Sequence, residues 1–425
     1  MINRIRLIIV FIFLLFNPPS FAQTGVNCTQ IQCVKILEGK LLVFSFDQGT
    51  YKPFFIKGVG YQPTPIARHP SDWGWLDDDP RSNNIYDDSS ILNRDFAKLR
   101  LMNANTIRLW KGNDTQEANR FPNKLTVRTL ILAAKYHLKI IAGFWVNGLT
   151  FDSQNNINDR QETISRFVEY VNNFKRYSAI LFWAIGNENN YNKIDGHLMT
   201  PEQLTAWYAL VNDMAQAAHD AEGSNFHPVA VVNGEIEHIG DAAYGAADEQ
   251  MPAVDIWGAN VYRGRSFYTL FSDYKKKSQK PLWVSEFGTD AWHVKDINNP
   301  DNGYEDQNTQ SDWIGSLWDE IVQNVPITIG GTVMEYSDEW WKPSEWRCTD
   351  SNLSQEENAK LVKRCISTHY HVGHPDNGYP DRFSTEAWFG IMSIARNSRL
   401  PHGPDIMKER KVYFTLQKKW QLNPY

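Results

Sequence analysis

Apolar runs rich in β-branched residues alternate along the chain with segments whose apolar positions follow a helical period. The runs that we interpret as strands begin near Phe54, Asn105, Leu138, Ile180, Pro228, Asp255, Pro281 and Ile327. Between these runs, apolar residues recur at spacings of three and four, which is typical of helices that bury one face. The clearest helical segments are residues 164–174, 201–222 and 313–321. This repeated strand–helix alternation predicts an α/β fold, a closed (β/α)8 TIM barrel of parallel strands.

Residues outside this alternation are expected to decorate the barrel. Residues 28–46 indicate an N-terminal hairpin that precedes the first barrel strand and lies at the bottom of the barrel. A long irregular insertion over residues 338–384 follows the eighth strand. The chain contains neither a low-complexity linker nor a short repeat. We therefore predict one domain over residues 23–425.

The amino terminus has the pattern of a targeting segment. Arg4 and Arg6 precede an uninterrupted apolar run over residues 7–16, and a small-residue segment ends at Ala22. A membrane anchor is the alternative, but this run is much shorter than the roughly 20 apolar residues that a bilayer requires. We predict a signal peptide over residues 1–22 and a secreted or periplasmic protein with no integral membrane segment after cleavage.

Export would place the cysteines in an oxidising compartment, where disulfides form. The four cysteines allow three pairings. We favour Cys28–Cys33 and Cys348–Cys365, because each of these bonds closes one irregular segment locally, and the second would staple the insertion after the eighth strand. Free thiols are disfavoured in such a compartment, and neither spacing is the C-x2-C of a zinc knuckle.

Composition narrows the class of ligand. The chain carries 49 acidic and 43 basic side chains, a formal net charge of −6, and no long basic run. A nucleic-acid partner is therefore not expected, because its phosphates would require clustered cations. The 16 tryptophans exceed what a core needs, which favours stacking on flat, partly apolar ligands.

Two glutamates end apolar runs of the predicted barrel. The fourth run ends in Asn187-Glu188, and the seventh ends in Glu286. Because the carboxyl ends of barrel strands meet at one mouth, both side chains are expected there. A salt bridge or a helix cap is the structural alternative. Burial of a carboxylate costs free energy of folding, so such a residue is expected to have an ion-pair partner or a catalytic role. At about 5–5.5 Å apart, two carboxylates can act as the nucleophile and the proton shuttle of a retaining glycosidase. Asn187 fits as a partner of the sugar 2-hydroxyl.

These positions resemble the signature of clan A retaining glycoside hydrolases. The resemblance implies that Glu188 is the acid/base and Glu286 the nucleophile. The second run contains Arg108, which is similar to the second-strand arginine that lies beneath the nucleophile in that clan. The sixth run is followed by Tyr262, which is similar to the tyrosine that hydrogen-bonds the nucleophile. Core packing is the alternative role for Tyr262.

The two ends of the barrel sequence resemble two families of that clan. Residues 55–62, which include Tyr61 and Gln62, are similar to the opening of the family 72 β-1,3-glucanosyltransferases, in which a glutamine at the position of Gln62 contacts substrate. Residues 334–341 resemble the eighth-strand end of family 2-type catalytic barrels, where a tryptophan forms the floor of the catalytic subsite. We favour Trp340 for that role. The resemblance implies a β-linked glucan substrate, with β-1,3-glucan favoured, while β-mannan, β-galactan and uronides remain open.

The predicted site combines two catalytic glutamates with a set of polar and aromatic side chains. Trp145 and Asn147 join this set because they end the third strand, although Trp145 could instead plug the barrel rim. Trp110 stands where the glucanosyltransferases usually carry tyrosine. The expected substrate-binding residues are Tyr61, Gln62, Arg108, Trp110, Trp145, Asn147, Asn187, Tyr262, Tyr336 and Trp340.

Two other function classes are weighed against a retaining glycosidase or transglycosylase. His369, His371 and His374 have a metal-like spacing, which could support a metal-dependent hydrolase, but they lie in the irregular insertion. No metal and no cofactor is therefore expected. A non-catalytic carbohydrate-binding barrel is the other alternative, although a binder does not need both Glu188 and Glu286. Hydrolysis and transfer use the same residues, so the sequence does not separate them.

Overall fold

The structure is a computed structural model that describes residues 27–66, 88–110, 125–146, 157–194, 197–299, 302–339, 374–395, 397 and 404–425. The predicted signal peptide and most of the predicted insertion lie outside the described residues. So do four individual predictions, which are Asn147, Trp340, Cys348 and Cys365.

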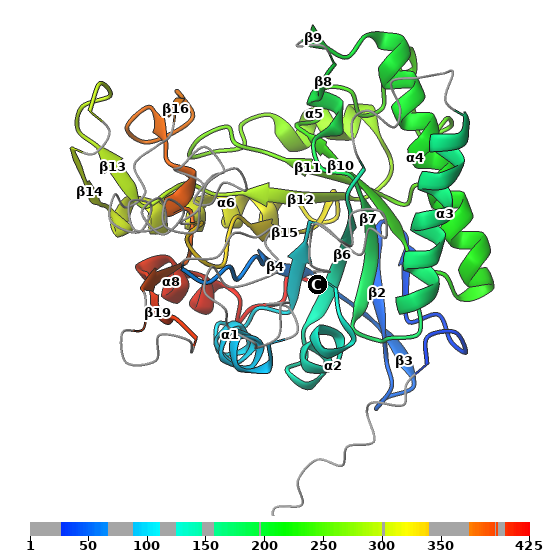
Figure 1. Ribbon diagram of the computed structural model, residues 1–425, viewed down its shortest axis with the longest axis horizontal. Helices are drawn as coiled ribbons and strands as arrows, with labels where there is room; N and C mark the ends of the chain where they lie inside the picture. The colour runs from blue at the N-terminus through cyan, green and yellow to red at the C-terminus, as the bar shows by residue number, and fades with distance from the viewer. Residues whose placement is uncertain are drawn as a thin grey trace, which may run out of the picture.

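Eight parallel strands close into a barrel, which confirms the predicted fold (Figure 1). The strands are β4 (Ile56–Gly60), β5 (Thr106–Leu109), β6 (Lys139–Phe144), β7 (Ile180–Ile185), β10 (Val229–Gly234), β11 (Ile256–Asn260), β12 (Leu282–Phe287) and β15 (Thr328–Val333). Each begins within two residues of its predicted start. The last strand pairs with the first, with Gly331 beside Lys57, so the sheet has no free edge. The strands read as continuous apolar runs because a barrel strand is buried on both faces.

Helices surround this barrel where the sequence shows a helical period. They are α1 (Ser89–Leu101), α2 (Val127–Lys135), α3 (Ile157–Phe174), α4 (Pro201–Glu222), α5 (Leu270–Lys277), α6 (Gln307–Gln323) and α8 (Lys411–Lys419). Helix α4 begins after Thr200, whose hydroxyl accepts from the backbone of Gln203 while the Gln203 side chain bonds back to Thr200. Figure 1 shows α3 and α4 side by side on one flank. None of the described helices has the length and apolarity needed to span a bilayer.

The amino-terminal segment forms three antiparallel strands rather than the predicted hairpin alone. These strands are β1 (Val34–Leu37), β2 (Lys40–Ser45) and β3 (Thr50–Pro53). Val34 and Leu41 pack in one apolar cluster with Ile56 and Ile256, the first residues of two barrel strands, so this sheet closes the amino-terminal end of the barrel.

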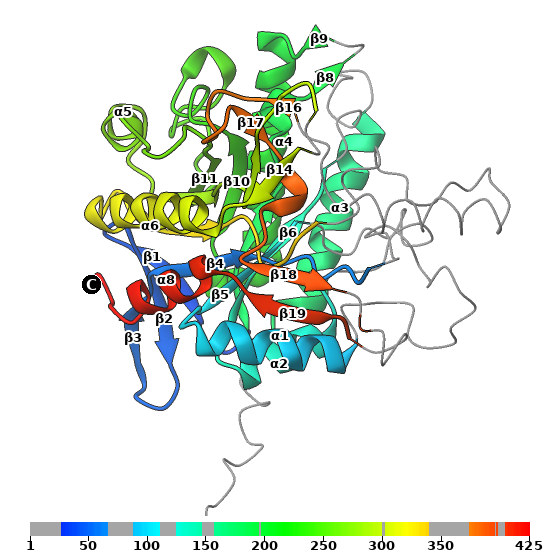
Figure 2. The ribbon, with the colours of Figure 1, turned by 90° about the vertical axis from the view of Figure 1, so that its left-hand side faces the viewer.

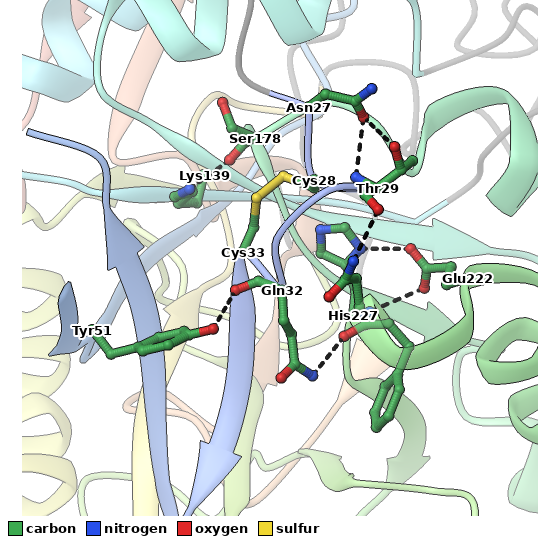
Figure 3. Close-up of a disulfide and its surroundings, with 12 residues drawn as sticks. Asn27, Cys28, Thr29, Gln32, Cys33, Tyr51, Lys139, Ser178, Glu222 and His227 are labelled. Atoms are coloured by element: carbon green, nitrogen blue, oxygen red, sulfur yellow. Dashed lines mark hydrogen bonds and ion pairs between the residues drawn. A yellow bond between two sulfur atoms is a disulfide. The ribbon is translucent and has the colours of Figure 1, made fainter. Parts of the chain in front are cut away.

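The predicted disulfide between Cys28 and Cys33 is confirmed. Both cysteines are buried in the apolar cluster at the amino-terminal end of the barrel. Figure 3 shows the bond next to Gln32, whose carbonyl accepts from the Tyr51 hydroxyl at 2.7 Å. The Gln32 side chain donates to the Phe226 carbonyl at 3.0 Å. The disulfide thus holds a turn that joins the added sheet to the barrel.

Short strands and turns lie outside the barrel. The short strands are β8 (Lys193–Ile194), β9 (His197–Leu198), β13 (Trp292–Val294), β14 (Gly303–Glu305), β16 (His374–Pro375), β17 (Phe383–Ser384), β18 (Met392–Ala395) and β19 (Ile406–Glu409). The 3₁₀ turns are η4 (Asn189–Tyr191), η5 (Gly223–Asn225), η6 (Ala242–Tyr244) and η8 (Glu386–Trp388). Strands β18 and β19 run beside α1, as Figure 2 shows, and Glu409 forms an ion pair with Lys98 of that helix.

The carboxyl-terminal part of the chain is anchored at the mouth of the barrel. The Ile391 amide donates to the Glu335 carbonyl at 2.9 Å, just beyond the end of β15. The buried guanidinium of Arg410 binds both carboxylate oxygens of Asp338, at 2.6 and 2.8 Å, and also Glu305 at 2.7 Å. A buried cation with two carboxylate partners is costly to disconnect, so this cluster holds the mouth in one arrangement.

Candidate active site

Glu188 lies on a sharp turn that follows β7. Gly186 has a φ of +71°, and a Cβ on it would lie 2.3 Å from the Asn189 Oδ1 atom, so glycine is required there. Glu188 itself has a φ of 55°, in the left-handed region that is uncommon for residues other than glycine. Its amide donates to the Val232 carbonyl of β10 at 3.0 Å, and the Asn187 amide donates to Asn189 Oδ1 at 2.9 Å. One bond to β10 and one within the turn therefore hold the backbone around Glu188.

Glu286 lies on β12, is 7% exposed, and accepts hydrogen bonds from three side chains. Arg108 of β5 donates from Nη1 to Oε1 at 2.7 Å and forms an ion pair with the carboxylate. The Trp110 indole donates to the same oxygen at 2.7 Å, and the Tyr262 hydroxyl donates to Oε2 at 3.0 Å. Three donors, one of them a cation, hold this buried carboxylate in one orientation.

The position of Trp110 depends on a glycine in the neighbouring strand. A Cβ on Gly60 of β4 would lie 2.3 Å from the Trp110 Cη2 atom. The indole therefore occupies space that a larger residue at position 60 would fill, and this brings its N–H to Glu286. Trp110 was predicted as a substrate contact, and in the structure its indole N–H donates to the Glu286 carboxylate.

A chain of side chains connects the two glutamates. Arg108 Nη2 donates to Asn187 Oδ1 at 2.7 Å. Asn260, the last residue of β11, donates from Nδ2 to Asn187 Oδ1 at 3.1 Å and to Glu188 Oε1 at 2.8 Å. Glu188 and Glu286 thus belong to one hydrogen-bond network at the carboxyl ends of the strands. Asn260 was not predicted, although its place at the end of an apolar run is the same signal that identified both glutamates.

The surroundings of Glu188 and Tyr262 raise the pKa of both groups. Burial and, to a smaller extent, the negative charge of Glu286 raise the pKa of Glu188 to about 7, against the opposing effects of the Asn260 hydrogen bond and the Arg108 charge. Burial and the charge of Glu286 also raise the pKa of Tyr262 well above its ordinary value. Tyr262 therefore remains a hydrogen-bond donor, and Glu188 can hold a proton near neutral pH.

Two predicted substrate contacts, Tyr61 and Tyr336, are bonded to a helix of the barrel. Tyr61 and Tyr336 are fully buried, and their hydroxyls donate to the two oxygens of Asp95 in α1, at 2.9 and 3.0 Å. The ring of Tyr61 also packs against Phe96 of the same helix at 5.4 Å. Both tyrosines follow barrel strands, but their side chains point toward the helical layer. They tie the ends of β4 and β15 to α1.

Two further predicted residues lie at strand ends with part of their surface exposed. Trp145, after β6, is 42% exposed and can present its indole to a ligand. Gln62, after β4, donates from Nε2 to Glu339 Oε1 at 3.3 Å. No group of three or more histidine, cysteine, aspartate or glutamate side chains within the described ranges could hold a metal ion, and His369 and His371 lie outside those ranges.

Comparison with solved structures shows similarity to glycosidase barrels. A β-D-glucuronidase of Dictyoglomus thermophilum has 15% identity and a TM-score of 0.52, over 92% of this chain and 54% of that chain. A GH2 β-galacturonidase of Eisenbergiella tayi bound to galacturonate has 12% identity and a TM-score of 0.53, over 92% and 54%. Gas2 in complex with compound 10 has 13% identity and a TM-score of 0.51, over 92% and 69%. The chain spans about half the length of the first two proteins, and identities this low show the fold alone.

Sequence comparison gives a more specific result. No curated protein sequence matches the chain. The model of the family described as glucanosyltransferase, glycoside hydrolase family 72, matches residues 25–342. That range is well over half of the chain and contains the eight barrel strands together with both glutamates. The chain therefore belongs to the glucanosyltransferase family of glycoside hydrolases.

Proposed function

We propose that this protein is a retaining β-glycosidase or transglycosylase that acts on β-linked glucan, with β-1,3-glucan as the favoured substrate. Membership of the glucanosyltransferase family supports this reaction class. The observation that carries the proposal is that two carboxylates of one hydrogen-bond network have different surroundings. Glu286 is held by Arg108, Trp110 and Tyr262, whereas burial raises the pKa of Glu188 to about 7. A charged nucleophile and a protonated acid are what double displacement requires.

In the first step, a carboxylate oxygen of Glu286 attacks the anomeric carbon of the sugar. The glycosidic carbon–oxygen bond breaks, and the proton of Glu188 moves to the leaving oxygen. Asn187 is proposed to position the sugar, because its Oδ1 accepts from Arg108 and Asn260. That arrangement leaves the Asn187 amide nitrogen to donate to the 2-hydroxyl, an interaction that strengthens in the transition state.

In the second step, Glu188 is a carboxylate and acts as a base. It takes the proton of a water molecule or of an acceptor sugar hydroxyl, whose oxygen attacks the anomeric carbon and releases Glu286. Water gives hydrolysis, and a sugar hydroxyl gives transfer. The residues of the network are the same in both reactions, so the outcome depends on how well an acceptor sugar competes with water.

We expect products from β-1,3-linked glucose oligosaccharides in a panel that also includes β-mannan, β-galactan and uronide oligosaccharides. Mass spectrometry of the products would separate the possibilities. Products shorter than the substrate alone indicate hydrolysis, and longer products indicate transfer. Binding of an oligosaccharide without any product would contradict an enzymatic function and favour the carbohydrate-binding barrel. Products from the uronides alone would overturn the glucan assignment, which matters because two similar structures are uronidases.

Replacing Tyr262 with Phe is expected to lower kcat/KM about 10- to 100-fold. The variant loses the hydrogen bond from the Tyr262 hydroxyl to Glu286, and a hydrogen bond to a charged group contributes about 1.5–3 kcal/mol. Steady-state kinetics on the preferred oligosaccharide measures the change. Tyr413→Phe is the matched control, because it removes a hydroxyl that donates to the Lys98 carbonyl outside the barrel. Equal kcat/KM in both variants would exclude Tyr262 from the site.

Export is proposed for the same protein. The apolar run over residues 7–16 follows two arginines and supports a signal peptide that is cleaved after Ala22. The disulfide between Cys28 and Cys33 supports an oxidising compartment, because such bonds are rare where thiols are kept reduced. A secreted or periplasmic location would also bring the enzyme to polymeric glucan, which does not cross membranes.

A further inference from the structure

Tyr191 lies directly beside Glu188 at the mouth of the barrel. The turn η4 follows Glu188, and the Tyr191 amide donates to the Glu188 carbonyl at 2.9 Å, which folds the chain back. The ring lies on Gly234, the last residue of β10. A Cβ on Gly234 would lie 2.3 Å from Tyr191 Cδ2 and 3.4 Å from Glu188 Cγ. The aromatic ring and the Glu188 side chain therefore flank the same patch of bare backbone.

The ring is supported from behind and open to solvent. Tyr191 contacts the His238 ring edge-to-face at 6.4 Å, and His238 packs in turn on Tyr244 at 4.8 Å. His238 also lies 3.3 Å from the amide of Asn190, which is bonded to Gly234 through both its amide and its carbonyl oxygen. Despite this support, Tyr191 is 36% exposed. An aromatic ring held rigidly with an open surface is suited to stacking on the apolar face of a pyranose.

Charged groups surround this ring. Burial raises the pKa of Tyr191, and the negative charges of Glu237, Glu235 and Glu188 raise it further. Glu235 binds Arg263 through two hydrogen bonds, at 2.6 and 2.8 Å, and about a quarter of each side chain is exposed. A partly exposed pair of this kind offers both an acceptor and a donor to sugar hydroxyls.

We propose that Tyr191 forms the binding site for the sugar on the Glu188 side of the broken bond, with the Glu235–Arg263 pair hydrogen-bonding its hydroxyls. The inference rests on the proposed function. In double displacement, Glu188 gives its proton to the leaving sugar and later takes a proton from the acceptor, so both sugars occupy the space next to Glu188. The site therefore binds a neutral hexopyranose as leaving group and as acceptor, and it determines how well a sugar competes with water.

The test compares two substrates that share the donor sugars and differ in the leaving group. One is a β-1,3-linked glucose oligosaccharide, whose leaving group is a sugar, and the other is the matching β-glycosyl fluoride, whose leaving group is fluoride. In Tyr191→Ala, the ratio of kcat/KM for the oligosaccharide to kcat/KM for the fluoride is expected to fall about tenfold. Tyr191→Phe keeps the ring, so its ratio is expected to stay within about twofold of the wild-type value.

Two further variants keep the test decisive. Tyr191→Leu retains bulk over Gly234, and we expect the same fall in the ratio if Tyr191→Ala does not fold. Phe414→Ala removes an exposed aromatic ring from α8 and is expected to keep the wild-type ratio. A ratio unchanged in the folded Tyr191 variants, or an equal loss on both substrates, would overturn the inference. Absence of any sugar product from the wild type would instead overturn the proposed function, and this inference with it.

Discussion

Replacing Glu286 with Gln is expected to lower kcat on a β-linked oligosaccharide by at least about 10⁴-fold while the oligosaccharide still binds. A neutral amide cannot attack the anomeric carbon, so the covalent intermediate does not form. The amide oxygen can still accept from Arg108 and Trp110, which preserves the shape of the site. Product formation measures kcat, and calorimetric titration with the oligosaccharide measures binding.

The control is Glu169→Gln, which makes the same change on the exposed face of α3 and should keep wild-type activity. Azide gives a second readout. In Glu286→Ala, azide can enter from the vacated side and displace the leaving group of an activated β-glycoside, which yields an α-glycosyl azide. A β-glycosyl azide, or turnover of Glu286→Gln near that of the wild type, would remove Glu286 as the nucleophile.

Replacing Glu188 with Gln is expected to have a large effect that depends on the leaving group. With a sugar leaving group, kcat should fall about 10²- to 10⁴-fold, because the leaving oxygen requires a proton. With fluoride as leaving group, the loss in forming the intermediate should be much smaller, because fluoride needs little protonation. Comparison of the two substrates in pre-steady-state kinetics separates the acid role from a general loss of structure.

The same variant should change the pH profile. Burial and the charge of Glu286 raise the pKa of Glu188 to about 7, so the acid is protonated below that pH and lost above it. The wild-type kcat/KM is therefore expected to decline as pH rises through about 7, and this limb should vanish in Glu188→Gln. Glu169→Gln should retain the limb. An alkaline limb that persists in Glu188→Gln would assign the proton donor to another group.

The sequence alone predicted the barrel, because each buried element has a recognisable pattern of apolar residues. A parallel strand covered on both faces is a continuous apolar run, and each run was placed within two residues of its strand. The same logic found Glu188 and Glu286, since a polar residue at the end of such a run must lie at the barrel mouth. The Cys28–Cys33 disulfide was predictable because it closes a short local loop.

Only the tertiary structure showed which side chains form hydrogen bonds with the two carboxylates. Asn260 bridges Glu188 to Asn187, and Trp110 reaches Glu286 only because Gly60 leaves room for its ring. Tyr61 and Tyr336 follow barrel strands in the same way as the true members of the network, yet both turn outward to Asp95. A strand end places a residue at the mouth, but the direction of its side chain depends on the register and packing of neighbouring strands. Those neighbours are distant in the chain, so barrel closure, and not local pattern, determines the partners of each carboxylate.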